Sequence, residues 1–233
     1  MSGLKPVQNP AMSQLLKIDF VSDISCPWCA IGLAALQQAL ERLPAAPVSL
    51  RLQPFELAPD LPEGGEGLAA MLTRKYGTTP EQQAAHYATL RQRGAELGFE
   101  FAPESRDRIY QTLNAHRLLH WAGLEHPERQ LALKQALLLA CHRDRLPMDA
   151  DDVLLAAVEA AGLDRERAME ILAGEEFAAA VREREAFYQQ AGVNSVPTLV
   201  INDRYVIAGS RPVEQLEQAL LQIAATGPSG AAA

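Results

Sequence analysis

The stretch Cys26-Pro27-Trp28-Cys29 decides the fold of this chain. A run with alternating apolar residues, 15–21, comes before it, and the apolar stretch 30–40 follows it. The alternation predicts a strand, and the later apolar spacing predicts a helix that begins near the proline. A strand, a sharp turn that carries C-x-x-C and then a helix form the setting in which two cysteines perform redox chemistry. The stretch therefore predicts a redox-active dithiol at the start of a helix.

The two cysteines are expected to differ in role. The first turn of a helix has unpaired N–H groups and the positive end of the helix dipole, which stabilise a negative charge on the sulfur of Cys26. Cys26 is therefore the candidate nucleophile, and Pro27 fits the first turn because its missing N–H needs no partner there. Cys29 follows on the same helical face, where it can attack a mixed disulfide at Cys26 and release the substrate. Trp28 is expected at the rim that a substrate touches.

Composition excludes several classes of protein. The 233 residues are 48% hydrophobic and 21% charged, which is ordinary for a globular protein. The net charge of −8 offers no basic surface for nucleic acid or for an anionic membrane. No secretory signal and no run of transmembrane length is recognisable, so we expect a cytoplasmic protein. Three cysteines do not form a disulfide framework, and in a reducing compartment the C-x-x-C pair indicates catalysis rather than a structural disulfide.

Strand patterns occur at both ends of the chain, and helix patterns lie between them. Residues 48–53 alternate like the first strand, so they complete a strand-helix-strand unit with parallel strands and a right-handed crossover. After residue 192 an antiparallel hairpin is predicted over 198–207, and a final helix over 212–223. The middle of the chain predicts helices over 68–76, 79–98, 106–121, 128–143, 150–161, 164–173 and 175–190.

This pattern predicts an α/β protein in which two halves, residues 14–57 and 191–225, form one domain. Residues 58–190 are predicted to form a large all-helical insertion domain between the halves. The remaining residues are predicted to be mobile tails, because 1–13 are polar and contain prolines and 226–233 consist of Thr, Gly, Pro, Ser and Ala.

Four motifs resemble those of a known family. They are Asp23-x-x-Cys26-Pro27-Trp28-Cys29-x-x-Gly32, Asn114-Ala115-His116-Arg117-Leu118, Gly192-Val193-x-x-Val196-Pro197-Thr198 and Tyr205-x-Ile207-x-Gly209. In order and spacing they resemble the DsbA-like thiol-disulfide oxidoreductases, and among these the FrnE-like branch. The resemblance implies a thioredoxin fold, βαβ followed by ββα, with the helical insertion between the halves.

The resemblance also implies a cis peptide bond at Val196–Pro197, lying against the two sulfurs. A cis X-Pro bond forces a tight turn and leaves the backbone of Val196 free to pair with an extended substrate. One position departs from the family, whose better-studied members carry a buried carboxylate where this chain has Phe20. Asp23 is therefore the candidate carboxylate beside Cys29. Two roles are open for it: proton exchange with Cys29, or acceptance of backbone hydrogen bonds in the turn.

The insertion motif has two interpretations. Asn114 and His116 can satisfy buried polar groups where the insertion meets the thioredoxin-like domain. Alternatively, Asn114 or Arg117 faces the active-site groove and binds an anionic group of a substrate, such as a glutathione carboxylate. Cys141 lies on an apolar helical stripe and is expected to be a buried, inert thiol. A structural zinc site is not expected, because such a site needs four ligands and the chain has no second C-x-x-C.

The sequence thus predicts a thiol-disulfide oxidoreductase that acts on protein or glutathione-type disulfides. No cofactor beyond the redox-active disulfide is expected, glutathione is a candidate co-substrate, and the protein is expected to be a monomer or a homodimer. Two alternatives stay open. A glutathione-dependent transferase or isomerase of the kappa and hydroxychromene-carboxylate isomerase type resembles this architecture, but usually has serine at the position of Cys26. A peptide-binding, chaperone-like module is the other alternative.

Overall fold

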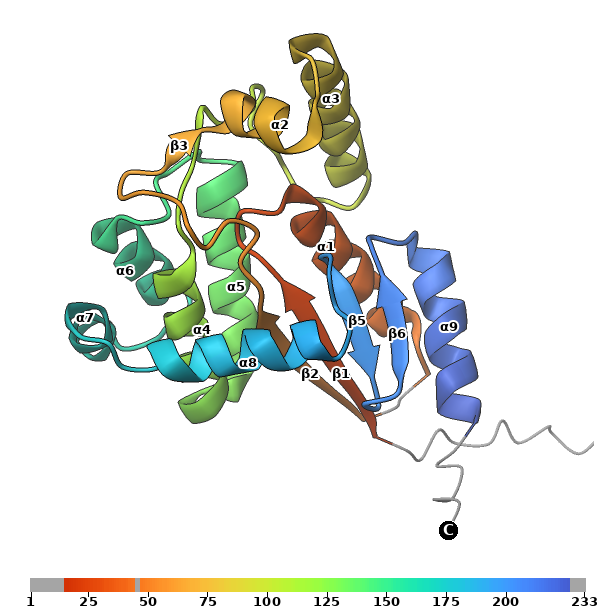
Figure 1. The fold of residues 1–233 in the computed structure, drawn as a ribbon. Coiled ribbons are helices and arrows are strands. Elements are labelled where there is room, and N and C mark those ends of the chain that lie inside the picture. Colours follow the sequence, from red (N-terminus) through yellow and green to blue (C-terminus); the bar gives the residue numbers. More distant parts are fainter. Residues whose placement is uncertain (1–14, 45–46, 227–233) are drawn as a thin grey trace, which may run out of the picture.

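Four strands form the central sheet, in the order β2-β1-β5-β6 (Figure 1). The computed structural model describes residues 15–44 and 47–226. In it β1 (Leu16–Ser22) pairs in parallel with β2 (Val48–Pro54), and α1 (Pro27–Arg42) connects the two. β5 (Thr198–Ile201) pairs antiparallel with β1 and with β6 (Tyr205–Ala208). The strand-helix-strand unit and the hairpin predicted from the sequence are confirmed, and their arrangement is the thioredoxin fold.

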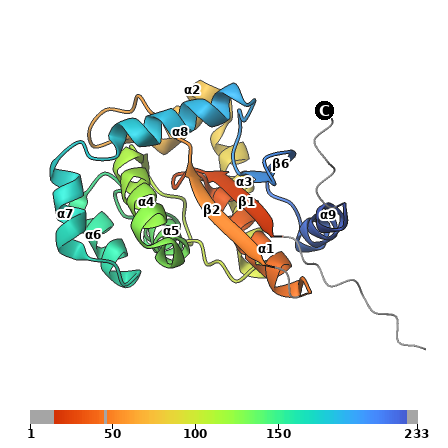
Figure 2. The same cartoon turned by 90° about the horizontal axis from the view of Figure 1, so that it is seen from below.

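Alternation along β1 divides its side chains between the two faces of the sheet. Leu16 and Phe20 pack with α1 and with α9 (Val213–Ala225) in one hydrophobic core. Val21 faces the other side, where it packs with Tyr188 of α8 (Ala178–Gln190). Figure 2 shows α8 crossing the sheet on the face opposite α1. The strand that leads into the C-x-x-C turn is therefore covered on both faces.

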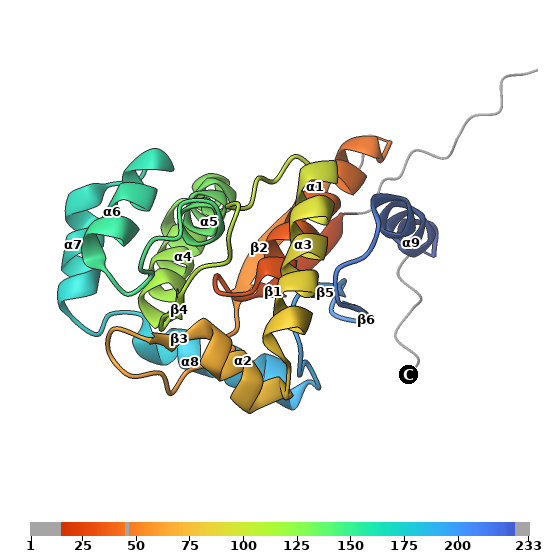
Figure 3. The ribbon, with the colours of Figure 1, turned by 90° about the horizontal axis from the view of Figure 1, so that it is seen from above.

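The insertion between β2 and β5 is helical except for a short two-stranded ribbon. Before α8 its helices are α2 (Leu68–Tyr76), α3 (Pro80–Glu96), α4 (Leu113–Glu125), α5 (Pro127–His142), α6 (Asp151–Ala160) and α7 (Arg165–Ala173). Figure 3 shows α4 to α7 gathered beside β2, at the end of the molecule away from α9. The ribbon pairs β3 (Glu66–Gly67) with β4 (Arg108–Ile109) and corrects the prediction of an all-helical insertion. Two residues per strand leave no alternating pattern in the sequence.

A helix start predicted from the sequence is wrong because a long-range contact uses the residues involved. The helix expected from residue 106 begins at Leu113, since β4 pairs with β3 just before it. The helix predicted from residue 150 begins at Asp151, and the carboxylate of the preceding Asp149 accepts a hydrogen bond from the Gly64 N–H at 3.0 Å instead of capping the helix. Thr79 caps α3 in a capping box with Gln82, an arrangement that needs only local contacts.

Two hydrophobic cores meet beneath the C-x-x-C turn. One surrounds Trp121 and Leu154 inside the insertion, and the other lies between the sheet and α1. Ile24, just before the turn, belongs to the insertion core, whereas Leu138 of α5 belongs to the sheet core. The dithiol therefore lies where the insertion and the sheet share side chains.

The predicted tails, residues 1–13 and 226–233, lie outside the described residues except for Thr226, which ends α9. Among the helices of the described residues, none combines the length and the apolar character required to cross a lipid bilayer.

Candidate active site

Cys26 and Cys29 lie at the N-terminus of α1, where the sequence predicts them. Cys26 is the N-cap residue, and its carbonyl accepts a hydrogen bond from the Cys29 N–H at 3.0 Å. Pro27 occupies the first helical position. Both cysteines are free thiols, and Cys26 keeps 4% exposure while Cys29 has none. Solvent therefore reaches Cys26, to a small extent, and does not reach Cys29.

The Val196–Pro197 turn lies against Cys26. Its peptide bond is cis, as the family resemblance implied. The Cys26 thiol donates a hydrogen bond to Val196 O, with Sγ and oxygen 3.7 Å apart. A Cβ at Gly32 would stand 2.9 Å from Pro197 Cγ, so α1 needs glycine there for the turn to approach. Motifs from the two ends of the chain thus meet at the Cys26 sulfur.

Asp23 is buried beneath the turn, and hydrogen bonds surround its carboxylate. The donors are the Ser25 N–H (3.1 Å), the Ser25 hydroxyl (2.6 Å), the Leu57 N–H (2.8 Å) and the Thr112 hydroxyl (2.8 Å). His116 Nε2 lies 3.5 Å from Asp23 Oδ1. These contacts tie the C-x-x-C turn to the segment after β2 and to the start of α4.

The hydrogen bonds decide the charge of Asp23. Burial alone would raise the pKa of Asp23, but the nearby His116 and the hydrogen bonds hold it well below its ordinary value. Burial lowers the pKa of His116 in spite of the carboxylate, so the imidazole is largely neutral at pH 7. We therefore attribute the low pKa of Asp23 to its N–H and O–H donors. A carboxylate with so low a pKa is a poor proton acceptor, and the geometry favours the turn-anchoring role of Asp23 over proton exchange.

Lys134 of α5, which is not among the site residues predicted from the sequence, is a buried cation in the neighbourhood of Cys29. Burial raises the pKa of Cys29 well above its ordinary value, and the Cys26 sulfur adds to this effect. The positive charge of Lys134 acts in the opposite direction. Lys134 is 1% exposed, and burial lowers its pKa to about 8, so most of it is protonated at pH 7. A lysine, rather than a carboxylate, is thus the ionised group that favours the Cys29 thiolate.

Trp28 is half-buried against α3 instead of standing free at the rim. Its indole N–H donates to His86 Nε2 at 3.2 Å, and the two rings meet edge to face with centroids 5.6 Å apart. Figure 1 shows α2 and α3 at the end of the sheet where α1 begins. Trp28 therefore links the C-x-x-C turn to the insertion.

Arg106, in the loop before β4, connects Cys141 to the same turn. Its guanidinium donates to Ser25 O and to Cys141 Sγ, each at 2.6 Å. Cys141 is buried, and burial raises its pKa. This environment keeps the thiol protonated and enclosed, in keeping with the inert role expected from the sequence.

The insertion motif brings His116 to the site, but not its neighbours. The Arg117 guanidinium donates to the carbonyls of Ile171, Gly174 and Glu176 around the end of α7. Asn114 Oδ1 accepts a further hydrogen bond from Arg117 at 2.8 Å. Both side chains are occupied in joining α4 to α7. The interpretation in which the motif satisfies buried polar groups fits this geometry, whereas a groove-facing Asn114 or Arg117 does not.

A buried acidic pair lies on the other side of the segment that binds Asp23. Glu56 and Glu185 are each 6% exposed, and Arg182 Nη1 lies 2.5 Å from Glu56 Oε1 and 3.6 Å from Glu185 Oε2. Among the described residues, one oxygen of each carboxylate has no hydrogen-bond partner. Burial and the charge of Glu56 raise the pKa of Glu185 to about 7. Because Glu56 and Glu185 are far apart in the sequence, no local motif predicts that they pair.

His116 and His120 are four residues apart on α4, a spacing that suits a pair of metal ligands. Across residues 15–44 and 47–226, however, no three His, Cys, Asp or Glu side chains are grouped so that they could hold a metal ion.

Comparisons with known proteins match nearly the whole chain. Residues 17–221 match the family model described as DSBA-like thioredoxin domain. A probable DsbA oxidoreductase from Streptomyces coelicolor is 32% identical, with a TM-score of 0.85 over 94% of this chain and 93% of that one. A comparison with curated protein sequences gave no match.

Two further structures share the fold at lower identity. The cytosolic disulfide reductase DsbM from Pseudomonas aeruginosa, in a structure with GSH, is 15% identical, with a TM-score of 0.63 over 89% of this chain and 98% of that one. A 2-hydroxychromene-2-carboxylate isomerase is also 15% identical, with a TM-score of 0.67 over 93% of this chain and 100% of that one. At this identity the likeness concerns the fold alone.

Proposed function

Because this chain belongs to the DSBA-like thioredoxin domain family, we propose that it is a thiol-disulfide oxidoreductase with Cys26 as nucleophile and Cys29 as resolving cysteine. One observation carries the proposal. Cys26 caps α1 with its sulfur 3.7 Å from Val196 O, while Cys29 is buried one turn behind it. The first sulfur lies at the N-terminus of α1, at the positive end of the helix dipole, and a substrate meets it before it can meet the second.

In the reducing direction, the Cys26 thiolate attacks one sulfur of a substrate disulfide. A bond forms between Cys26 and that sulfur, and the other substrate sulfur leaves as a thiolate that takes a proton from solvent. The Cys29 thiolate then attacks Cys26 Sγ, and the first substrate sulfur leaves in the same way. The substrate gains two electrons, and the Cys26–Cys29 pair is left as a disulfide. The reverse sequence oxidises a substrate dithiol.

The second step needs the Cys29 thiolate, which burial disfavours. Lys134 supports this step, because its charge lowers the pKa of Cys29 and the ammonium is largely protonated at pH 7. Asp23 contributes by holding the turn through Ser25 and Leu57, so that the two sulfurs keep their relative positions.

We further propose that glutathione is a co-substrate and that the protein works in the cytoplasm. Support comes from the shared fold of DsbM, which is described as cytosolic and whose structure was determined with GSH. No resident cofactor is required, because the dithiol itself carries both electrons. The reduction potential of the Cys26–Cys29 pair sets the direction: a value below the glutathione poise makes the protein a reductase, and one above it an oxidant or isomerase.

Reduction of insulin disulfides by glutathione, with and without the protein, tests the proposal. Wild type should accelerate the reaction, and Cys26→Ser should return it to the rate without protein. Cys29→Ala should lose turnover yet still form the mixed disulfide, while Cys141→Ala serves as the matched control and should keep the wild-type rate. Normal activity of Cys26→Ser would rule the mechanism out.

The same variants separate the two alternatives. Transfer of glutathione to an electrophile that survives in Cys26→Ser would support a transferase or isomerase like the hydroxychromene-carboxylate enzyme, whose fold this chain shares. A wild-type protein with no disulfide activity, and full suppression of aggregation by the Cys26→Ser/Cys29→Ala double variant, would support a chaperone-like module.

A further inference from the structure

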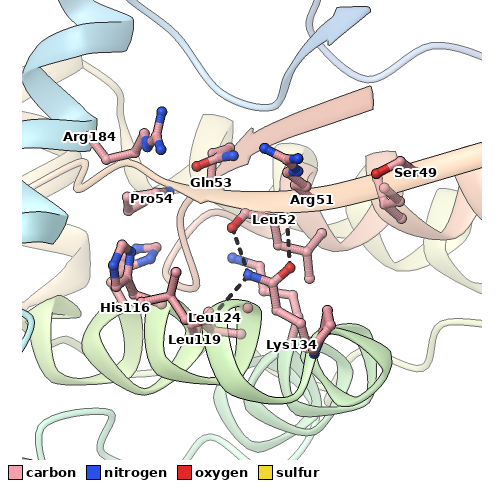
Figure 4. A pocket seen from close by; sticks show the side chains of 15 residues that line it. Ser49, Arg51, Leu52, Gln53, Pro54, His116, Leu119, Leu124, Lys134 and Arg184 are labelled. Atoms are coloured by element: carbon pink, nitrogen blue, oxygen red, sulfur yellow. Dashed lines mark hydrogen bonds between the residues drawn. The ribbon is translucent and has the colours of Figure 1, made fainter. Parts of the chain in front are cut away.

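A cavity of about 420 Å³ lies between the edge strand β2 and helices α4 and α5. Its size falls within the range of small-molecule pockets, roughly 300–1,000 Å³. Figure 4 shows Arg51 and Gln53 along the strand, with His116, Leu119 and Lys134 across from them on the helices. Neither cysteine of the dithiol lines it, so the cavity is separate from the surface at which Cys26 meets a substrate.

The cavity is positively charged in a protein that is negatively charged overall. Arg51, Lys134 and Arg184 line it, and no Asp or Glu is among its lining residues. Within the part of the chain that the structure describes, none of these three cations forms an ion pair. The net charge of the chain is −8, so the charge of the cavity lining is opposite to the net charge of the protein.

Lys134 makes the cavity unusual, because an unpaired cation is rarely buried. Only 1% of the residue is exposed, and no hydrogen bond joins its ammonium to another described residue. The nearby carboxylate of Asp23 is already occupied by Ser25, Leu57 and Thr112. Burial raises the pKa of Cys29 and keeps this thiol protonated in the reduced protein, so an anion in the cavity would give Lys134 a charged partner.

The deep part of the cavity offers a single positive charge. Burial lowers the pKa of both His116 and His120, so these imidazoles are neutral at pH 7. Lys134 remains largely protonated, with a pKa of about 8. Arg51 and Arg184 lie at the exposed rim, where solvent weakens the effect of their charges without removing it. A monoanion matches this arrangement better than a doubly charged phosphate.

The edge of β2 is closed to an added peptide strand. The side chain of Gln130 accepts from the Leu52 N–H at 3.0 Å and donates to Leu52 O at 3.2 Å. Both backbone groups that a new strand would need at this point are therefore paired. Beside Gln130, the buried Leu119 and the exposed Leu124 form an apolar part of the cavity wall. This geometry favours a small molecule with an apolar part over an extended peptide.

We propose that this cavity binds a small organic monocarboxylate, with the carboxylate at Lys134 and the apolar part against Leu119 and Leu124. Lys134 also lowers the pKa of Cys29, so turnover would report on both roles of this lysine, and the test therefore uses binding.

Calorimetric titration of the reduced full-length protein tests the proposal with benzoate as the probe. Benzamide is the neutral probe of the same shape, and inorganic phosphate is the doubly charged one. Benzoate should bind saturably with one site, about tenfold or more tighter than either, because only it gains a charge-assisted hydrogen bond at Lys134 without excess charge. Lys134→Met should lower the affinity for benzoate by a similar factor. Arg91→Gln replaces an exposed arginine on α3 and should leave this affinity unchanged.

Arg184→Glu reverses the charge at the exposed rim and keeps the test decisive even where Lys134→Met does not fold. It should weaken benzoate severalfold. Benzamide or phosphate binding as tightly as benzoate would overturn the proposal. So would wild-type benzoate affinity in Arg184→Glu, or in a folded Lys134→Met.

Discussion

The two sides of the C-x-x-C turn are built from different interactions. On one side, Cys26 faces the Val196 turn through a single sulfur–carbonyl contact of 3.7 Å. On the other, Cys29 is enclosed among buried charged groups, with Lys134 and the hydrogen-bonded Asp23 nearby. The Cys26 side, called the open side below, can break its weak contact when a substrate binds. The Cys29 side, called the fixed side, is held in place by its buried contacts. The difference in burial therefore supports the two roles that the positions of the cysteines at the start of the helix predict.

Alkylation should expose the largest difference between the two sides. Iodoacetamide should modify Cys26 in the native reduced protein at least about 100-fold faster than Cys29 or Cys141, since the buried thiols react only after local opening. Fragmentation mass spectrometry of the peptide that contains both turn cysteines measures the two rates. Similar rates for Cys26 and Cys29 would show that the two sides do not differ as described.

Removing the carboxylate of Asp23 should damage the fixed side. In Asp23→Ala the N–H groups of Ser25 and Leu57 and the hydroxyl of Thr112 lose their acceptor in a buried place. We expect the free energy of unfolding to fall by about 3–5 kcal/mol, measured by urea denaturation. Asp23→Asn keeps an acceptor oxygen and should lose less. A loss below about 1 kcal/mol in Asp23→Ala would argue against the anchoring role.

Adding one methyl group should disturb the open side. Gly32→Ala places a Cβ 2.9 Å from Pro197 Cγ, so the turn must shift away from Cys26. Overpacking of this kind costs about 1–3 kcal/mol of unfolding free energy, which urea denaturation measures. Gly67→Ala is the control, because its new Cβ meets no atom closer than 4.0 Å. Equal stabilities of the two variants would mean that Pro197 does not depend on glycine at position 32.

The smallest effect is expected at Glu185, behind the fixed side. Its pKa is about 7 in the folded protein and near 4.5 in the unfolded chain, so between these values only the folded state keeps the proton. The stability that this proton contributes is present below pH 4.5 and is lost as the pH rises through 7. The stability of Glu185→Gln should not show this decrease as the pH rises.

Urea denaturation of wild type and Glu185→Gln at pH 5 and pH 8 measures the effect. Relative to the variant, wild type should lose on the order of 1 kcal/mol between the two pH values, because the partly exposed Arg182 beside Glu185 offsets part of the charge that the carboxylate gains. Titrating groups that do not interact with Glu185 are common to both proteins and cancel in the difference. A constant difference would show that Glu185 ionises normally.

Local patterns and motifs predicted the frame of the site. The alternation before Cys26, the proline at the first helical position and the hairpin after Thr198 depend on neighbouring residues, and each is found in the structure. The approach of Val196–Pro197 to the dithiol came from the family resemblance, because no local rule joins segments so far apart in the chain.

The groups beneath the turn could not be predicted in the same way. A lysine in a helix is normally solvated, yet Lys134 lies on the stripe that also carries Gln130, Leu137 and Cys141, and this unusual position was the available signal. Arg106 was assigned to a helix, but its guanidinium instead binds Ser25 O from a loop. Such contacts depend on how the insertion packs on the sheet, which the sequence pattern does not specify.

The central claim is that Cys26 forms the mixed disulfide and Cys29 resolves it, and one trapping measurement tests it directly. Cys29→Ala is incubated with glutathione disulfide, and the adduct is located by peptide mass spectrometry. The account predicts one glutathione per chain, attached to Cys26, which dithiothreitol removes and which wild type does not accumulate. An adduct on Cys141, or none on a folded variant, would contradict it.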